Sequence, residues 1–204
     1  MRTAIANVVM TIVIAGVAEA AEVARTTADE AMALCRSVER LSGDARAAAD
    51  RLEEGLRLAE AAVAADANEL SAHMAVVCNL GKRLELSGIG LRTLGRVHRM
   101  KEAIDRASAI APDAAEVLVA KGEFLRRLPA FLGGDHELGR ALLQRAVELH
   151  PDDVQARLYL ARALAADGSP EARARLVDAL AAARRCGAPA EQREAQALLA
   201  SLPD

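Results

Sequence analysis

The strongest constraint on the fold is a helix break that recurs at a nearly constant spacing. Pro112 and Pro151 lie 39 residues apart, and residues 66–69 break the chain in a similar way earlier. A small residue stands five positions before each break, and another follows ten positions or a little more after it. These residues are Ala62, Ala107 and Ala146 before the breaks, and Gly81, Gly122 and Ala161 after them. The pattern predicts a repeated unit of two closely packed helices.

The composition also favours helices. Hydrophobic residues make up 52% of the 204 residues, but aromatic residues only 1%, and tryptophan is absent. A core with so few rings has to close by packing small side chains, and alanine, leucine and arginine are strong helix formers. No convincing run of alternating β-branched residues follows residue 20. We therefore predict an all-α protein with helices at residues 27–41, 45–65, 69–86, 91–110, 114–127, 136–149, 154–166, 170–185 and 190–201.

Local signals mark where several of these helices begin and end. Pro129 ends the helix before it, because proline disfavours α geometry in the preceding residue. The pair at 133–134, Gly-Gly, permits a turn. Asp135 and Asp44 are predicted N-caps, because an aspartate side chain accepts a free amide of the first helical turn. Pro151 ends the helix that Asp135 begins.

The first twenty residues differ from the rest of the chain. Arg2 precedes an apolar run at 4–17, and Ala18-Glu19-Ala20 matches the small-x-small rule for signal peptidase. We predict a signal peptide at 1–20 and a mature chain that starts near Ala21, which places the protein in the periplasm. The alternatives are an uncleaved membrane anchor, or a first helix packed on the body of a cytoplasmic protein. No later segment is apolar enough to cross a bilayer.

Charge and cysteine usage narrow the functional classes. The net charge is −3, the pI is about 5.9, and basic residues are interspersed with acidic ones. A nucleic-acid partner is not expected, because such binders need a basic field and stacking aromatic side chains. Three cysteines are present, Cys35, Cys78 and Cys186, so one of them is unpaired within the chain. The sequence leaves open which pair, if any, forms a disulfide.

The repeated unit resembles the tetratricopeptide repeat (TPR). Three first helices match it, and the second-helix positions are matched by Gly139, Leu143, Ala146 and Pro151. The first-helix matches are Leu80-Gly81-x-x-Leu84, Lys121-Gly122-x-x-Leu125 and Leu160-Ala161-x-x-Leu164. The periods are longer than the usual length of about 34 residues, and the aromatic positions are aliphatic. The resemblance implies a divergent right-handed α-solenoid of about four helical hairpins in one domain at 21–204.

A narrower resemblance covers residues 45–166. The element LP-x3-GGD-x3-G-x5-A-x4-P, which starts at Leu128, is its most specific part. It is similar to the T-component proteins of tripartite ATP-independent periplasmic (TRAP) transporters, and a broader relation links it to TPR proteins that regulate microtubule dynamics. The transporter relation implies a periplasmic protein that works by binding, with an extracytoplasmic solute-binding protein as partner and with homo-oligomers. Family members are often lipoproteins, but this chain lacks a lipobox.

No catalytic or metal-binding pattern is found, so we expect no enzymatic activity, no cofactor and no metal. The four histidines form no H-E-x-x-H, and no serine lies in G-x-S-x-G. His136 and Glu137 beside Asp135 are better explained as the first turn of a capped helix than as a metal site. Gly133-Gly134-Asp135 is better explained as a turn than as a phosphate loop, because no lysine or further glycine follows.

A binding groove is the better functional candidate. Helical solenoids present the first helix of each pair on a concave face. Projecting the repeat register places eight residues toward that face or its edge: Lys82, Glu85, Glu116, Glu123, Arg126, Arg127, Gln155 and Arg162. The enlarged turn after Pro129 adds Phe131 as a ninth candidate. Arg126 and Arg127, next to Phe131, form the preferred cluster.

The sequence thus predicts a non-enzymatic periplasmic binding or scaffold protein that is associated with a TRAP-type transporter or its solute-binding protein. The alternative function is a general TPR adaptor for protein–protein interactions in cell-envelope assembly.

Overall fold

The computed structural model describes residues 2–41 and 43–202 of the chain. Within these ranges the regular secondary structure is entirely helical, which confirms the all-α prediction. The α-helices are α1 (Arg2–Ser37), α2 (Ala45–Ala65), α3 (Leu70–Ser87), α4 (Leu94–Ile110), α5 (Ala115–Arg127), α6 (His136–Leu149), α7 (Val154–Ala166), α8 (Ala172–Arg185) and α9 (Pro189–Ser201). Short 3-10 helices cover Val38–Leu41, Leu91–Thr93 and Ala130–Leu132.

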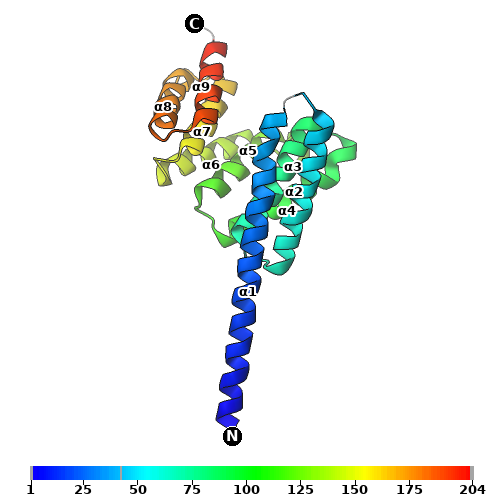
Figure 1. The fold of residues 1–204 in the computed structure, drawn as a ribbon. Helices are drawn as coiled ribbons and strands as arrows, with labels where there is room; N and C mark the ends of the chain where they lie inside the picture. Colours follow the sequence, from blue (N-terminus) through cyan, green and yellow to red (C-terminus); the bar gives the residue numbers. More distant parts are fainter. Residues whose placement is uncertain (1, 42, 203–204) are drawn as a thin grey trace. The chain divides into compact units, whose positions relative to one another are not determined.

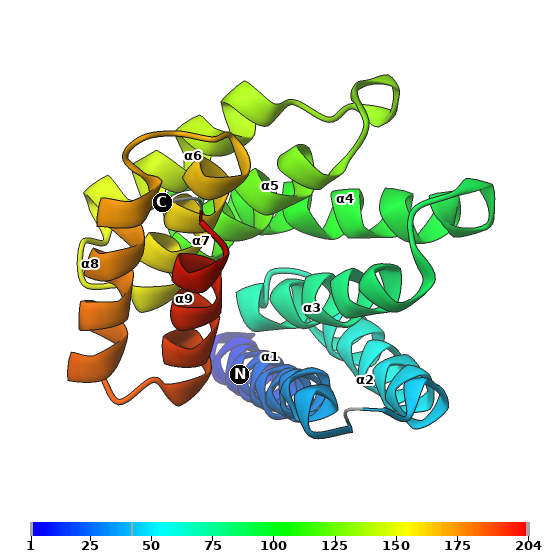
Figure 2. The ribbon, with the colours of Figure 1, turned by 90° about the horizontal axis from the view of Figure 1, so that it is seen from above.

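The chain divides into two compact units, residues 1–110 (unit 1) and 111–204 (unit 2). In unit 1, α1 packs on α2 and α3, and α3 packs on α4 (Figures 1 and 2). In unit 2, α5 pairs with α6, α7 pairs with α8, and α9 packs on α8 and α7. Both units are therefore built from the helical hairpins of the predicted α-solenoid.

The predicted helix boundaries agree with the structure to within one residue except at three helices. The helix expected at 91–110 begins as a 3-10 helix and becomes α4 only at Leu94, and the helix expected at 170–185 begins at Ala172, so Pro170 precedes it. The largest difference is at the first helix. We expected it at 27–41, but α1 starts at Arg2 and the chain turns into a 3-10 helix after Ser37. Residues 2–37 contain no proline and a single glycine, so nothing in this segment interrupts a helix. Both predicted N-caps are confirmed. The carboxylate of Asp44 accepts the amide of Ala47, and that of Asp135 accepts the amide of Leu138, each at 2.9 Å.

Unit 1 is closed by a stripe of small residues on α1. Ala24, Ala28, Ala31 and Cys35 recur every three or four positions, so they lie on one face of the helix, and all four are fully buried. Small side chains on this face let α1 approach α2 and α3 closely, and dispersion contacts then replace the missing bulk.

A buried asparagine fixes the register of these three helices. Asn79 of α3 is fully buried, and its side-chain amide donates to the main-chain oxygen of Ala31 in α1 at 3.2 Å and of Ala75 at 2.9 Å. A Cβ atom added at Gly55 of α2 would collide with the Asn79 side chain. The glycine therefore makes room for a polar link between α1 and α3.

A disulfide joins the same two helices. Cys35 of α1 bonds to Cys78 of α3, with 6.2 Å between the Cα atoms, while Cys186 is free and exposed. The pairing that the sequence left open is thus assigned. It closes a loop with a sequence separation of 43 residues, which includes the whole of α2.

The predicted signal peptide falls largely outside the described side chains, which begin at Glu19. The backbone continues as α1 through Ala20, and Ala24, the first buried residue among the described side chains, follows the predicted cleavage site. The signal peptide stays a prediction. In the described part of the chain, no helix combines the length and the hydrophobicity that a bilayer crossing requires.

Candidate interaction surface

The first helix pair of unit 2 is held together by two facing glycines. A Cβ atom at Gly122 of α5 would lie 2.8 Å from the main-chain oxygen of Gly139 in α6. A Cβ atom at Gly139 would lie 2.7 Å from the oxygen of Gly122 and 2.6 Å from Cγ of Arg126. Such contacts are too short for real carbon atoms, so α5 and α6 can approach this closely only with glycine at both positions.

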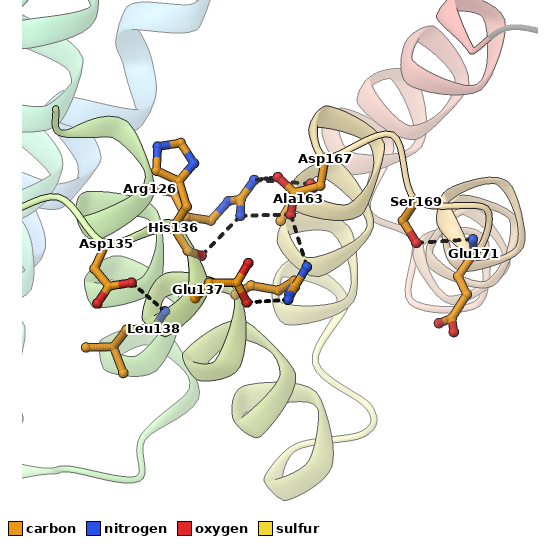
Figure 3. A network of polar contacts seen from close by, with 10 residues as sticks. Arg126, Asp135, His136, Glu137, Leu138, Ala163, Asp167, Ser169 and Glu171 are labelled. Carbon is orange, nitrogen blue, oxygen red and sulfur yellow. Dashed lines mark hydrogen bonds and ion pairs between the residues drawn. The ribbon is translucent and has the colours of Figure 1, made fainter. Parts of the chain in front are cut away.

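The close approach places Arg126 between three helices rather than in an open groove. Its Nη2 donates to Oδ1 of Asp167 at 2.7 Å and to the main-chain oxygen of Ala163 at 3.1 Å. Its Nη1 donates to Oδ2 of Asp167 at 3.1 Å and to the oxygen of His136 at 3.3 Å. Figure 3 shows the guanidinium surrounded by these acceptors. Only 8% of the Arg126 side chain is exposed, so it acts as a clip joining α5, α6 and the end of α7.

The clip also changes the acidity of its carboxylate. The hydrogen bond from Arg126 lowers the pKa of Asp167, and the charges of Arg126, Arg140 and His136 lower it further, although desolvation opposes them. Arg140 of α6 lies 3.7 Å from Oδ2 of Asp167. The carboxylate is therefore held in its charged form by α5 and α6 together.

A second set of charges runs across the first helices of the pairs, α5, α7 and α9. Arg162 of α7 donates through Nη2 to Glu123 of α5, and through Nη1 to Glu194 of α9 at 3.0 Å. Arg127 also pairs with Glu123, with Nε 3.4 Å from Oε2. The guanidinium of Arg162 stacks over the ring of Tyr159, 4.2 Å from its centroid, as cation–π contacts do.

Burial and neighbouring charges shift the pKa values of Arg162 and Tyr159. Burial opposes the charge of Arg162, but the carboxylates of Glu123 and Glu194 favour it, and the pKa of Arg162 is raised overall. Burial also raises the pKa of Tyr159. Arg162 therefore remains a cation and Tyr159 a neutral phenol at physiological pH.

Further positions on α5 and α7 lie on the same face as these charges. Glu116 stands seven residues before Glu123, and Gln155 seven residues before Arg162, which returns each to the same side of its helix. Both are exposed, in the first turns of α5 and α7. We call this set the charged face: Glu116, Glu123 and Arg127 of α5, Gln155, Tyr159 and Arg162 of α7, and Glu194 of α9.

Phe131 is held out on a hydrogen-bonded loop between α5 and α6. Its side chain is 85% exposed. The loop is closed by main-chain bonds from Leu132 and Gly134 to the oxygen of Pro129, at 2.9 and 3.1 Å, and Gly133 adopts a left-handed φ of 89°. The loop thus presents an exposed aromatic side chain on a backbone that its own bonds fix.

The nine predicted site residues are separated by the structure into several groups. Glu116, Glu123, Arg127, Gln155 and Arg162 come together on the charged face, whereas Arg126 belongs to the buried clip and Phe131 to the loop. Lys82 and Glu85 lie in unit 1, where Lys82 pairs with Glu39 at 3.0 Å. The binding role of all nine stays a prediction.

Four residues whose side chains take part in these networks were not predicted: Arg140, Tyr159, Asp167 and Glu194. Tyr159 carries a signal, because it lies three residues before Arg162 and so on the same helical face. Asp167 and Glu194 reach their partners from separate helices, and no spacing rule in the sequence points to such contacts.

These groups offer hydrogen-bond donors and acceptors of both charges. The charged face combines three carboxylates, two guanidinium groups, an amide and a phenol ring. Among the described residues, no group of three His, Cys, Asp or Glu side chains is placed to hold a metal ion.

Comparisons with known proteins identify the fold. No protein-family model matches the chain, and a search of curated proteins finds no related sequence. Among solved structures, the chain is similar to TTC0263, a thermophilic TPR protein of Thermus thermophilus, with a TM-score of 0.60 and 19% identity over 83% of this chain and 88% of that one. It also matches YrrB, a TPR protein with an unusual peptide-binding site, with a TM-score of 0.42 and 21% identity over 82% of this chain and 89% of that one.

Proposed function

We propose that this TPR-like protein is a non-enzymatic scaffold that binds a segment of a partner protein on the charged face of unit 2. The observation that carries the proposal is the alignment of polar side chains across α5, α7 and α9. Repeat solenoids use the surface formed by successive helices for binding. The mixed charges suit an extended polypeptide, whose backbone and side chains offer both donors and acceptors.

The partner is expected to engage the exposed members of the charged face first. Glu116 and Gln155 are exposed, and neither takes part in the Arg162 network. Replacing both with lysine changes the local charge without removing a contact that holds the helices together. We expect the variant to fold normally and to lose its partner.

The test is affinity capture with identification of the bound protein by mass spectrometry. The variant Glu116→Lys, Gln155→Lys is compared with Gln144→Lys, Asp178→Lys, which makes the same change in charge at exposed positions of the second helices α6 and α8. Loss of one recovered protein in the first variant alone supports the charged face. Equal recovery from both variants contradicts it.

We also propose that the protein is exported to the periplasm. The apolar run at 4–17, followed by Ala18-Glu19-Ala20, supports cleavage after Ala20. Such cleavage would spare the residues of α1 that the structure describes as buried, from Ala24 to Cys35. The bond between Cys35 and Cys78 is typical of an oxidising compartment. N-terminal sequencing of the protein from a periplasmic extract should find Ala21 first, and an intact Met1 in the cytosolic fraction would contradict export.

Within the periplasm we propose association with a TRAP-type transporter or its solute-binding protein, on the strength of the resemblance over residues 45–166. An adaptor role in envelope assembly is the alternative. Transporter genes next to the gene for this chain, and a solute-binding protein in the capture experiment, would favour the first. Recovery of envelope-assembly proteins would favour the second.

A further inference from the structure

The turn between α3 and α4 in unit 1 gathers exposed aliphatic side chains. Leu86 is 47% exposed, Ile89 is 39% exposed and Leu91 is 89% exposed. They fall within six residues, on a turn that contains Gly88 and Gly90. We call residues 86–96 the α3–α4 tip. Single exposed leucines are ordinary on protein surfaces, but a group of this kind is a feature that calls for a partner.

The same segment is rich in basic residues. Residues 86–101 contain four Lys or Arg and no Asp or Glu, although the whole chain has a net charge of −3. Arg99 pairs with Glu60, and Lys101 with Asp105. Arg92 and Arg96, which lie on the tip itself, take part in no ion pair among the described residues.

These two arginines do not stabilise α4: Arg96 lies in its first turn, and Arg92 lies in the 3-10 helix just before it. Cations at the start of a helix oppose the positive end of its macrodipole, and the first turn of α4 carries no acidic residue to compensate. In contrast, α5, α6 and α9 each have a glutamate in the first turn. The first turns of α2, α3, α7 and α8 also lack an acidic residue, but each of these helices has Asp or Glu at its N-cap, whereas Thr93 precedes α4. A charge that opposes the helix dipole costs stability, and such costs are expected at surfaces that bind a ligand.

The tip is held in shape by its own polar groups, which leaves few of them for a partner. The hydroxyl of Thr93 accepts the amide of Gly90 at 2.8 Å, and the amide of Thr93 donates to the oxygen of Gly90 at 2.9 Å. Thr93 is buried, and the hydroxyl of Ser87 donates to the oxygen of Arg83 at 2.8 Å. On its outer surface the tip exposes the side chains of Ile89, Leu91 and Arg92, and Arg96 is half-buried in the first turn of α4.

We propose that the α3–α4 tip docks on a membrane surface that contains anionic phospholipids. Leu91 and Ile89 would enter the boundary between headgroups and acyl chains, while Arg92 and Arg96 bind lipid phosphates. This combination of apolar insertion and positive charge is what holds peripheral proteins on bilayers. A protein partner is less well matched, because specific interfaces use about one directed hydrogen bond per 100–200 Å². The contact needs no helix that crosses the membrane.

The absence of tryptophan from the chain allows a direct test. Leu91→Trp places a single indole on the tip, and Phe131→Trp places one at a comparably exposed site in unit 2. The full chain is mixed with vesicles of phosphatidylglycerol and phosphatidylcholine in equal parts, or of phosphatidylcholine alone. We expect a blue shift of emission for Leu91→Trp with the anionic vesicles only, and no shift for Phe131→Trp.

Charge reversal at Arg92 and Arg96 then measures how much these two side chains contribute to vesicle binding. Each arginine near an anionic surface contributes a factor of about five in affinity, so Arg92→Glu with Arg96→Glu should weaken the binding of Leu91→Trp by roughly 25-fold or more. The apolar segment at 4–17 is present in every variant, so its own affinity for lipid cancels in the comparison. Circular dichroism is used to check that each variant is helical.

The outcomes decide the proposal. An unchanged Leu91→Trp spectrum, an equal shift with phosphatidylcholine alone, or an equal shift in Phe131→Trp would each overturn it. Undiminished binding after charge reversal would do the same. A shift with soluble poly-glutamate but not with vesicles would assign the tip to an acidic protein instead, and a shift with glycerol phosphate alone would assign it to a free phosphate compound.

Discussion

Unit 1 and unit 2 are built from the same helical hairpins but are fastened by different forces. In unit 1, α1 is joined to α3 by the Cys35–Cys78 disulfide and by the uncharged Asn79. In unit 2, the links between successive pairs are guanidinium groups, Arg126 on Asp167 and Arg162 on Glu123 and Glu194. Unit 1 also has ion pairs between its helices, such as Arg99 with Glu60, but among the described residues the covalent link lies in unit 1. The cohesion of unit 1 should therefore depend on redox state, whereas that of unit 2 should depend on charge and not on redox state.

The largest effect is expected from loss of the disulfide. Removing a cross-link that closes a loop of this size costs about 4 kcal/mol of unfolding free energy in the chain-entropy treatment. Cys35→Ala with Cys78→Ala should therefore speed hydrogen exchange, measured peptide by peptide, in α1 and α3. Cys186→Ser is the matched control, because Cys186 is free and exposed, and it should leave exchange unchanged. Equal acceleration in α5 to α9 would break the proposed difference between the units.

The next effect concerns the glycine contact of unit 2. In Gly122→Ala the new methyl group meets the backbone oxygen of Gly139, which cannot move as a side chain would, so α5 and α6 must separate. Overpacking of this kind costs about 1–3 kcal/mol, and we expect the upper end. Gly95→Ala is the control, since a Cβ atom there meets nothing within 4 Å. Because Gly95 is the second residue of α4, the gain in helix propensity is small, and the variant should unfold at the same urea concentration as the wild type or slightly above it. A neutral Gly122→Ala would show that the contact is not tight.

The helices and the close approach at Gly122 and Gly139 could be predicted from the sequence, because both are local or repeat at a fixed period. The disulfide partner could not, since the pairing depends on how α1 packs on α3. The sequence also did not predict that Arg126 joins α5, α6 and the end of α7. Its place in the repeat suggested a groove, but its length lets it reach Asp167, 41 residues further along the chain. Sequence spacing gives the face of a helix, whereas the partner of a long charged side chain is decided by packing.

A smaller effect is expected from the arginine clip. Arg126→Met keeps much of the side-chain volume but removes the hydrogen bonds to Asp167 and to two main-chain oxygens. Charge-assisted bonds of this kind contribute about 2 kcal/mol in total once solvation is counted. Arg145→Met is the control within unit 2, because Arg145 and Asp113 are both more than half exposed and such pairs contribute little. If the two variants unfold at the same urea concentration, the clip is not what fastens α5 to α7.

The smallest effect is a pH dependence that should belong to unit 2. The pKa of Asp167 is lower in the folded protein than the value of about 3.9 for a free aspartate. Its contribution to stability is therefore fully present above that value and is lost as the pH falls through the folded pKa. Asp167→Asn lacks this dependence, so the stability difference between wild type and variant should shrink in acid. Because solvent screens this partly exposed carboxylate, the change should be modest, and hydrogen exchange should place it in α5, α6 and α7. A stability difference that stays constant as the pH falls would mean that Arg126 does not lower the pKa of Asp167. The ionic links between the helix pairs of unit 2 would then be those of Arg162 alone.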